Sequence, residues 1–316
     1  MSPPNRDSQC TTRTFRWAGA HGVRLFLIYA EDVSDPLQTP SLDQPWMIAA
    51  FEGWNDAGDA ATGVIDHLID EWDAQVMIEL DPEDFYDFQM NRPHVGTDED
   101  GKRFINWPAT VLYQAKLPHL GRDVILVRGL EPNLRWQKFC STLLGIAELT
   151  GVTDVVTLGA LLADTPHTRP VPITGHTGDP DVAKRLDLEP SRYHGPIGIN
   201  GVFSENAAAM GVSTVSLWAA VPHYLAEPPC PKATLALLGR LEDVMETPLP
   251  QGLLTELSEA WQHGAEDLAS NDEEISEYVR SLESEREPSE LPEASGDAIA
   301  REFERYLRRR SAEGDK

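Results

Sequence analysis

The sequence predicts an α/β protein: a mainly parallel β-sheet with helices on both faces, followed by a C-terminal helical appendage. The first observation is that strand-length aliphatic runs alternate with helix-like stretches over residues 23–221. The second is that several of these runs are continuously aliphatic, which is typical of strands buried on both faces. The third is that helical periodicity takes over after Pro231. We therefore predict a disordered leader over 1–22, a core domain over 23–230 and a helical region over 231–316.

The predicted strands are short β-branched or aliphatic segments: residues 25–29, 47–51, 76–80, 110–114, 124–128, 155–159 and 213–218. Helical stretches separate them at residues 56–72, 135–149 and 200–210. In the first stretch, apolar side chains recur at three- and four-residue spacing, the pattern of a helix with one buried face. Asn55 or Asp56 can cap it. Strand, crossover helix and strand form the unit of a parallel sheet covered on both faces, which predicts the fold class.

The C-terminal region contains three apolar stripes at helical spacing, which begin at Leu235, Leu254 and Ile275. A last helix is predicted after Ser295, which can serve as its cap. Isolated helices of this length are marginally stable in water. We therefore expect these helices to pack on the core domain or on a sister subunit.

The net charge of −26 is large for a chain of 316 residues. Such a charge repels nucleic acid and anionic membrane surfaces, so we predict neither as a partner. It permits binding to a basic protein partner, but it is equally explained by solubility alone.

The termini and the cysteines predict a cytoplasmic protein. The first ten residues contain no apolar run of the kind that a secretory signal needs, and no apolar stretch approaches the length of a membrane-spanning helix. The cysteines Cys10, Cys140 and Cys230 are odd in number and widely spaced, which fits a reducing compartment and disfavours a disulfide framework.

Four segments carry side chains that could do chemistry, and the first directly follows a predicted strand. Residues 51–59 contain Glu52, Asn55 and Asp56 where a strand leads into a helix. Ligands gather beyond the carboxyl ends of parallel strands, where a helix N-terminus offers free N–H groups. The carboxylates of Glu52, Asp56 and Asp59 would repel an anion. The spacing therefore predicts either a ligand-binding loop or a helix cap after a tight glycine turn.

The second segment, residues 159–170, also follows a buried strand. Asp164, His167 and Arg169 form a titratable cluster in it. A His near a carboxylate can act as a general base, and an Arg can hold a carboxylate or phosphate. The alternative is a rigid turn between two prolines that an Asp–Arg pair locks.

The third and fourth segments are rich in glycine and in aromatic residues. The third runs from Tyr193 to Gly201 and contains Gly195 and Asn200. Its glycines allow the backbone to approach either a ligand or a neighbouring strand closely. The fourth places His223 at the end of the last predicted strand, where it either faces the same crevice or covers the sheet edge.

The familiar catalytic and cofactor motifs are missing from the sequence. It has no HExxH, no GxSxG, no Walker loop and no pair of His residues at metal-ligand spacing on a helix. We therefore predict no metal and no cofactor, and we leave open whether the protein is an enzyme.

The four segments, taken together and in this order, resemble the proteasome-assembly-chaperone-2-like (PAC2) family. The matching motifs are a Gly-Trp-Asn-Asp-Ala-Gly turn at 53–58, a Pro-His-Thr-Arg-Pro loop at 166–170, a Tyr-x-Gly-Pro-x-Gly-Ile turn at 193–199 and a Ser-Leu-Trp-x-x-Val-Pro-His-Tyr strand end at 216–224. The resemblance spans roughly residues 25–245 and points to the actinobacterial branch of the family.

This resemblance implies a phosphorylase/hydrolase-like α/β core and a homo-oligomer, for instance a trimer. It also implies a role in assembling or binding proteasome α-rings, with proteasome or AAA-ATPase subunits as partners. Family members that use a C-terminal hydrophobic–Tyr–any-residue tail dock into proteasome pockets with it. This sequence ends in Ser-Ala-Glu-Gly-Asp-Lys, so the resemblance does not predict tail docking here.

Two functional hypotheses follow. The first is a non-catalytic protein-interaction or proteasome-assembly-chaperone-like factor. The alternative is a phosphorylase/hydrolase-like enzyme for a nucleoside- or peptide-like ligand, with His167 as base, Arg169 as anion holder and Asp164 orienting the His. Its ligand-binding residues would be Glu52, Asn55, Asp56, Tyr193, Gly195, Asn200 and His223.

Overall fold

The computed structural model describes residues 42–285, except 99, 118–120 and 189–193. The predicted leader over 1–22, the predicted strand at 25–29, Tyr193 and the helix predicted after Ser295 lie outside the described residues.

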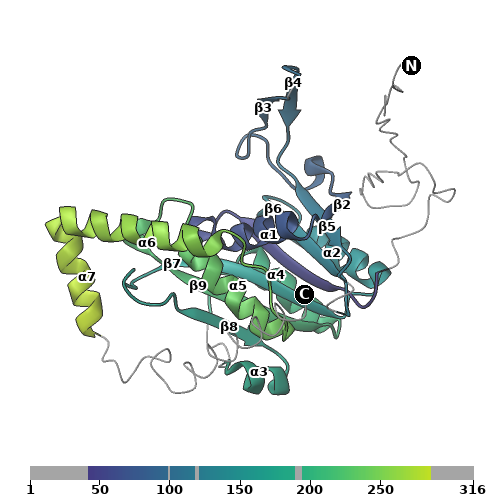
Figure 1. Ribbon diagram of the computed structural model, residues 1–316. Coiled ribbons are helices and arrows are strands. Elements are labelled where there is room, and N and C mark those ends of the chain that lie inside the picture. Colours follow the sequence, from purple (N-terminus) through teal and green to yellow (C-terminus); the bar gives the residue numbers. More distant parts are fainter. Residues whose placement is uncertain (1–41, 99, 118–120, 189–193, 286–316) are drawn as a thin grey trace, which may run out of the picture.

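A seven-stranded sheet forms the centre of the structure, in the order β2-β5-β6-β1-β7-β9-β8 (Figure 1). The four central strands β6, β1, β7 and β9 are mutually parallel, and the pairings nearer the two edges are antiparallel. The strands span Trp46–Glu52 (β1), Gln75–Glu79 (β2), Thr110–Ala115 (β5), Val124–Leu130 (β6), Asp154–Ala163 (β7), Ile173–Thr177 (β8) and Ser213–Pro222 (β9).

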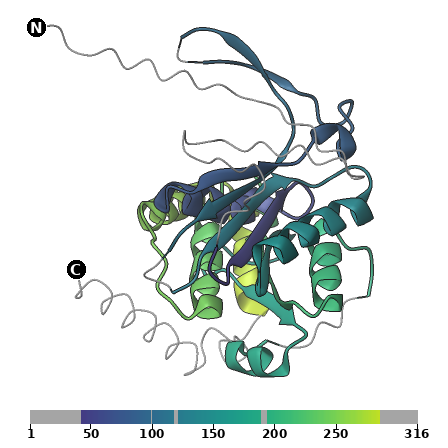
Figure 2. The same ribbon diagram turned by 90° about the vertical axis from the view of Figure 1, so that its right-hand side faces the viewer.

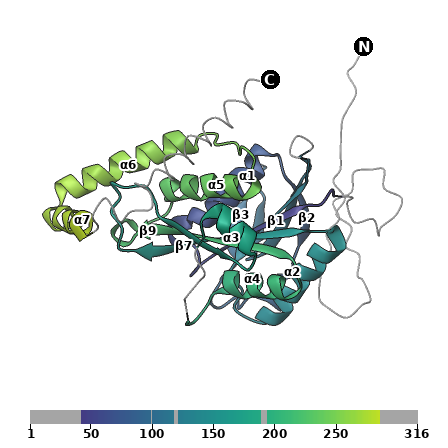
Figure 3. The same cartoon turned by 90° about the horizontal axis from the view of Figure 1, so that it is seen from below.

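Helices cover both faces of the sheet, as Figure 3 shows. Side chains of β1 alternate between the two apolar layers: Ile48 joins the layer with α1 and α5, and Met47 joins the layer with α2 and α4. Each fully buried aliphatic side chain stabilises the fold by roughly 1.5–3 kcal/mol. The helices span Ala60–Glu71 (α1), Trp136–Thr150 (α2), Ile199–Ala209 (α4) and Pro231–Met245 (α5). The predicted fold class is confirmed.

Several elements were not predicted from the sequence. They are the edge strand β8, a hairpin of β3 (His94–Thr97) and β4 (Arg103–Asn106), the short helix α3 (Pro180–Leu186), and 3-10 turns at Ala57–Asp59 (η1), Pro82–Asp84 (η2) and His223–Leu225 (η4). Most side chains of the two hairpin strands are exposed, so their sequences contain no run of apolar residues that would mark a buried strand. Burial periodicity, on which the strand predictions rested, is therefore absent there.

The first helix after residue 230 belongs to the core and not to a separate helical region. Helix α5 lies in the main apolar layer beside α1, with Leu237, Leu238 and Leu241 fully buried. Helix α6 (Leu254–Asn271) packs on α5, and α7 (Glu273–Glu285) contacts α6. No helix among the described residues is long and apolar enough to cross a membrane.

Candidate functional site at the carboxyl ends of the parallel strands

The loops that follow β1, β6, β7 and β9 lie at the edge of the sheet where their carboxyl ends meet. Helix α1, after β1, covers one face, whereas α2, after β6, covers the other. Such a change of side between neighbouring strands is where α/β proteins commonly bind ligands. The predicted site residues that the structure describes lie in or beside these loops or at the start of α4.

Asp56 caps helix α1. Its carboxylate is 5 % exposed and accepts hydrogen bonds from the Ala61 N–H at 2.7 Å, from the Thr62 N–H and from the Thr62 hydroxyl. Burial raises the pKa of this carboxyl group to about 6. The capping alternative of the sequence analysis therefore describes what Asp56 does here.

Glu52 forms an ion pair with Arg128 of β6. The same guanidinium contacts Asp66 of α1 at 2.8 Å. The three charged side chains tie β1, β6 and α1 together at the surface.

A buried polar cluster joins three loops around Glu131, directly after β6. One carboxylate oxygen of Glu131 accepts from Asn55 Nδ2 at 2.8 Å and from the Ile199 N–H at 2.9 Å. Asn200 is fully buried, and its Nδ2 donates to the Leu158 carbonyl at 2.8 Å. A Cβ atom at Gly198 would lie 2.0 Å from Asn55 Oδ1.

Of the proposed ligand-binding residues, Asn55 binds Glu131, whereas Asn200, the residue next to Ile199, binds β7 through Leu158. Glu131 itself was missed, although its place directly after a predicted strand was a usable signal. Gly195 lies on an exposed bend before α4. Both Asn side chains are buried: Asn55 and Glu131 join the loops after β1 and β6 to the start of α4, and Asn200 joins the start of α4 to β7.

His167 belongs to the loop after β7 and is 2 % exposed. Its backbone N–H donates to the Tyr224 hydroxyl at 2.8 Å, and its Nδ1 lies 2.8 Å from the same oxygen. The hydroxyl has one proton and two acceptor lone pairs, so it can bind the backbone N–H together with either neutral tautomer of the ring. Burial, and then the nearby Lys232 ammonium, lower the pKa of His167 and favour the neutral ring.

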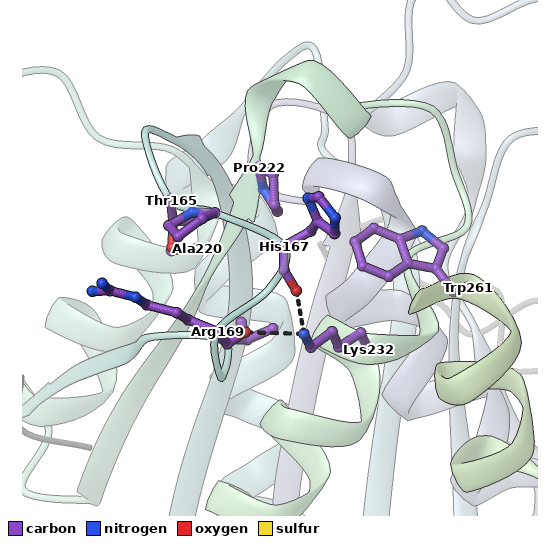
Figure 4. A pocket seen from close by; sticks show the side chains of 9 residues that line it. Thr165, His167, Arg169, Ala220, Pro222, Lys232 and Trp261 are labelled. Atoms are coloured by element: carbon purple, nitrogen blue, oxygen red, sulfur yellow. Dashed lines mark hydrogen bonds between the residues drawn. The ribbon is translucent and has the colours of Figure 1, made fainter. Parts of the chain in front are cut away.

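Lys232 of α5 fixes the backbone of this loop. Its ammonium donates to the carbonyls of His167 at 2.5 Å and Arg169 at 2.9 Å, and to Gln262 Oε1 of α6 at 2.6 Å. Figure 4 shows the two backbone contacts beneath the loop. Helix α5 thus holds the loop directly, and α6 contributes through Gln262.

Helix α7 closes over the same loop. The Tyr278 hydroxyl donates to Asp164 at 2.9 Å, and the Tyr278 ring lies edge-on to His223 with centroids 5.1 Å apart. Arg169 donates to the Glu283 carbonyl at 2.7 Å. Asp164 therefore pairs with Tyr278 and His223 (3.3 Å) rather than orienting His167, for which Tyr224 is the partner.

A small cavity remains beneath the loop, lined by Thr165, Pro166, His167, Arg169, Val171, Ala220, Pro222, Lys232 and Trp261 (Figure 4). Its volume is about 10 Å³. That is room for about one water molecule, whereas pockets for drug-sized ligands measure roughly 300–1,000 Å³. Among the described residues, no group of three or more His, Cys, Asp or Glu side chains is placed to hold a metal ion.

A statistical model of the PAC2 family matches residues 50–269. The chain belongs to the PAC2 family. All four sequence motifs lie within these residues, so the resemblance to the PAC2 family is confirmed. A search of curated proteins found no match.

Three solved structures share the fold of this PAC2 chain, and two of them also share much of its sequence. A PAC2 family protein from Streptomyces avermitilis is 55 % identical, with a TM-score of 0.70, over 74 % of this chain and 99 % of that chain. A Mycobacterium tuberculosis proteasome-assembly chaperone homologue is 46 % identical, with a TM-score of 0.68, over the same shares. The Pyrococcus furiosus archaeal proteasome activator PbaB, at 16 % identity and a TM-score of 0.60 over 73 % of this chain and 96 % of that chain, shares the fold.

Proposed function

We propose that this PAC2 protein is a non-catalytic, homo-oligomeric interaction factor of the cytoplasm that assists proteasome assembly. A relative with 46 % identity is described as a proteasome-assembly chaperone homologue, and that similarity covers nearly all of the relative. The partner that we propose is the proteasome α-subunit, and the alternative partner is a subunit of the AAA-ATPase.

The proposal that the protein is non-catalytic rests on the contacts that the titratable side chains at the strand ends make. Asp56 caps α1, Glu52 binds Arg128, and His167 binds Tyr224 beneath a loop that α7 covers. An active site needs reactive groups that face a space large enough for the substrate. Here these groups bind one another and the backbone, and the cavity that His167 lines measures about 10 Å³. This supports a non-catalytic protein that functions by binding partners through its outer surface.

Co-elution with purified proteasome subunits tests the proposal. The full-length protein is mixed with proteasome α-subunits from Streptomyces or Mycobacterium, and separately with assembled core particles and with the AAA-ATPase. We expect a complex with the α-subunits and faster α-ring formation, measured by size-exclusion chromatography with light scattering. An unrelated acidic protein of similar charge is the control for non-specific attraction, because the chain carries −26. Elution of the chain apart from all three partners would overturn the proposal.

The enzyme alternative makes a different prediction for the same protein. Thermal denaturation is measured with phosphate, nucleosides and dipeptides, since a ligand at ~100 times its dissociation constant stabilises by ~2.7 kcal/mol. We expect no stabilisation. A shift that is lost in the His167→Ala/Arg169→Ala variant would favour an enzyme at the strand ends instead.

A further inference from the structure

Three polar side chains from different elements meet beyond the ends of β7 and β9. Asp164 follows β7, His223 follows β9, and Tyr278 belongs to α7. The Tyr278 hydroxyl oxygen lies 2.9 Å from Asp164 Oδ1 and 3.5 Å from His223 Nδ1, and the latter two atoms are 3.3 Å apart. Each of the three atoms is therefore within 3.5 Å of both others. We call these three residues the α7 latch.

The separations within the α7 latch match those between metal ligands. A tetrahedral zinc ion holds imidazole nitrogen and carboxylate oxygen atoms at about 2.0–2.2 Å, so two of its ligand atoms lie about 3.3–3.6 Å apart. Three atoms with the separations observed here lie about 1.9 Å from a common centre, and about 2.1 Å from a point just outside their plane. One ion can thus bind all three residues with little movement of the chain.

Ring packing holds two of the three side chains in position. Tyr224 lies edge-on to His223 and to Tyr278, with ring centroids 5.9 Å and 5.8 Å apart, and its own hydroxyl is held by the His167 N–H. The His223 and Tyr278 rings also lie edge-on to each other. Contacts behind metal ligands fix their orientation and so raise metal affinity. The α7 latch is therefore arranged before an ion binds.

The donor atoms of the α7 latch select the class of ion. An imidazole nitrogen suits first-row transition metals, whereas Ca²⁺ and Mg²⁺ take oxygen ligands. The side chains of His223 and Asp164 are 46 % and 79 % exposed, so an ion can enter from solvent and water can complete its coordination. The set is not a cluster of three His, Cys, Asp or Glu side chains, of which the described residues contain none, because its third ligand is a phenol.

We propose that the α7 latch binds a transition-metal ion of the Zn²⁺ type, and that this ion fastens α7 to the ends of β7 and β9. His223 binds through Nδ1 with its proton on Nε2, and the Tyr278 hydroxyl gives its proton to solvent when it binds. Helix α7 lies across one end of the molecule in Figure 1, and Figure 2 shows it in yellow behind the sheet. The bound ion keeps α7 closed over the loop after β7.

Titration calorimetry with Zn²⁺ tests the site, on the full-length protein without a histidine tag and after removal of metal with a chelator. We expect one ion per chain. Asp164→Asn, His223→Gln and Tyr278→Phe should each weaken binding at least about tenfold, because even the loss of a contact behind a metal ligand costs about 10- to 100-fold. His263→Gln, an exposed His on α6 whose Nδ1 contacts the Glu259 carbonyl, is the matched control. Equal affinity in the wild type and the three latch variants would mean an adventitious ion only and would overturn the proposal.

Amide exchange tests whether the ion fastens α7. Opening of α7 separates Tyr278 from the other two ligands, so Zn²⁺ at about 100 times its dissociation constant should slow exchange through this opening about 100-fold in residues 273–285. Tyr278→Phe keeps the ring but removes the ligand oxygen, so zinc should leave its exchange unchanged. Asp164→Asn alters an exposed side chain and should behave alike, which protects the test if Tyr278→Phe misfolds.

Zinc binding that leaves exchange in α7 of the wild type unchanged would also overturn the proposal, because the ion would then not join α7 to the strand ends. Neither measurement involves proteasome subunits. Failure of this inference is therefore distinguishable from failure of the proposed function, which co-elution with α-subunits tests.

Discussion

At the scale of single residues, the best-defined groups at the strand ends are those that bury polar atoms. Asp56 is held by three donors at the start of α1, and Glu131 receives two donors from different loops. Buried polar groups cost free energy unless they are hydrogen-bonded. These residues therefore have measurable effects on stability.

Asp56→Asn should change how stability depends on pH. The pKa of Asp56 is raised from 3.8 to about 6, so the folded state binds a proton more tightly than the unfolded state. The stabilisation from this proton is complete below pH 3.8 and is lost as pH rises through 6, a loss of about 3 kcal/mol. The variant lacks this loss, so its stability relative to wild type should rise by up to about 3 kcal/mol between pH 4 and pH 7. Urea denaturation across this range, with the exposed Asp70→Asn as control, measures it; parallel curves would contradict it.

Gly198→Ala should destabilise the protein, because the new Cβ would overlap Asn55 Oδ1 in the Glu131 cluster. Overpacking a buried site costs about 1–3 kcal/mol. Gly145→Ala in α2 is the matched control: nothing lies within 4 Å of its Cβ position, and Ala in place of Gly in a helix stabilises by about 1 kcal/mol. Thermal denaturation should thus show changes of opposite sign, and equal changes would argue against the close contact.

At the scale of elements, α7 is joined to the strand-end loops through few contacts. Tyr278 supplies the hydroxyl that binds Asp164 and the ring that packs against His223 and Tyr224. An aromatic pair contributes about 0.5–1.5 kcal/mol beyond its buried area, and a hydrogen bond about 1 kcal/mol. Helix α7 should therefore open locally more easily than the sheet.

Tyr278→Ala should accelerate this local opening. Loss of about 2 kcal/mol corresponds to roughly 30-fold faster amide exchange in residues 273–285 and 164–170, measured by mass spectrometry. Arg280→Ala lies on the same helix, and its hydrogen bonds go to Ser276 within α7, so it is the matched control. Unchanged exchange in the Tyr278 variant would show that α7 is held by other contacts.

Element prediction from the sequence worked where both faces of a strand are buried. Residues 47–51 and 124–128 contain runs of apolar side chains that belong to β1 and β6, and the structure extends each by one or two residues. It failed for β8 and the β3–β4 hairpin, whose residues are mostly half-buried or exposed and so lack an apolar signature. It also underestimated β7 and β9, since Leu161 and Leu162 are exposed and extend the strand through pairing with β9.

At the scale of the whole molecule, α6 covers apolar residues of α5. Its inner face packs on α5 and thus on the core. A change at α6 should therefore affect stability, and its removal should also affect self-association because it uncovers apolar surface.

Ending the chain at Gln251 should change the oligomeric state and lower the melting temperature. The deletion uncovers the α5 residues that α6 packs against, and newly exposed apolar surface promotes association. Light scattering and thermal denaturation measure the two effects. A chain that ends at Glu285 keeps α6 and α7 and is the control. An unchanged, soluble oligomer after truncation at 251 would contradict this prediction.

The sequence by itself determined the α/β class, the central parallel strands and the PAC2 family, because buried strands and ordered motifs leave local patterns. It also placed the chemistry-bearing residues at strand ends. The tertiary structure decided what those residues do. Only packing could show that Asp164 meets Tyr278 of α7, that Asn55 and Ile199 share Glu131, and that Lys232 of α5 holds the His167 loop. Each of these contacts joins residues more than 60 positions apart, and local patterns carry no information about such pairs.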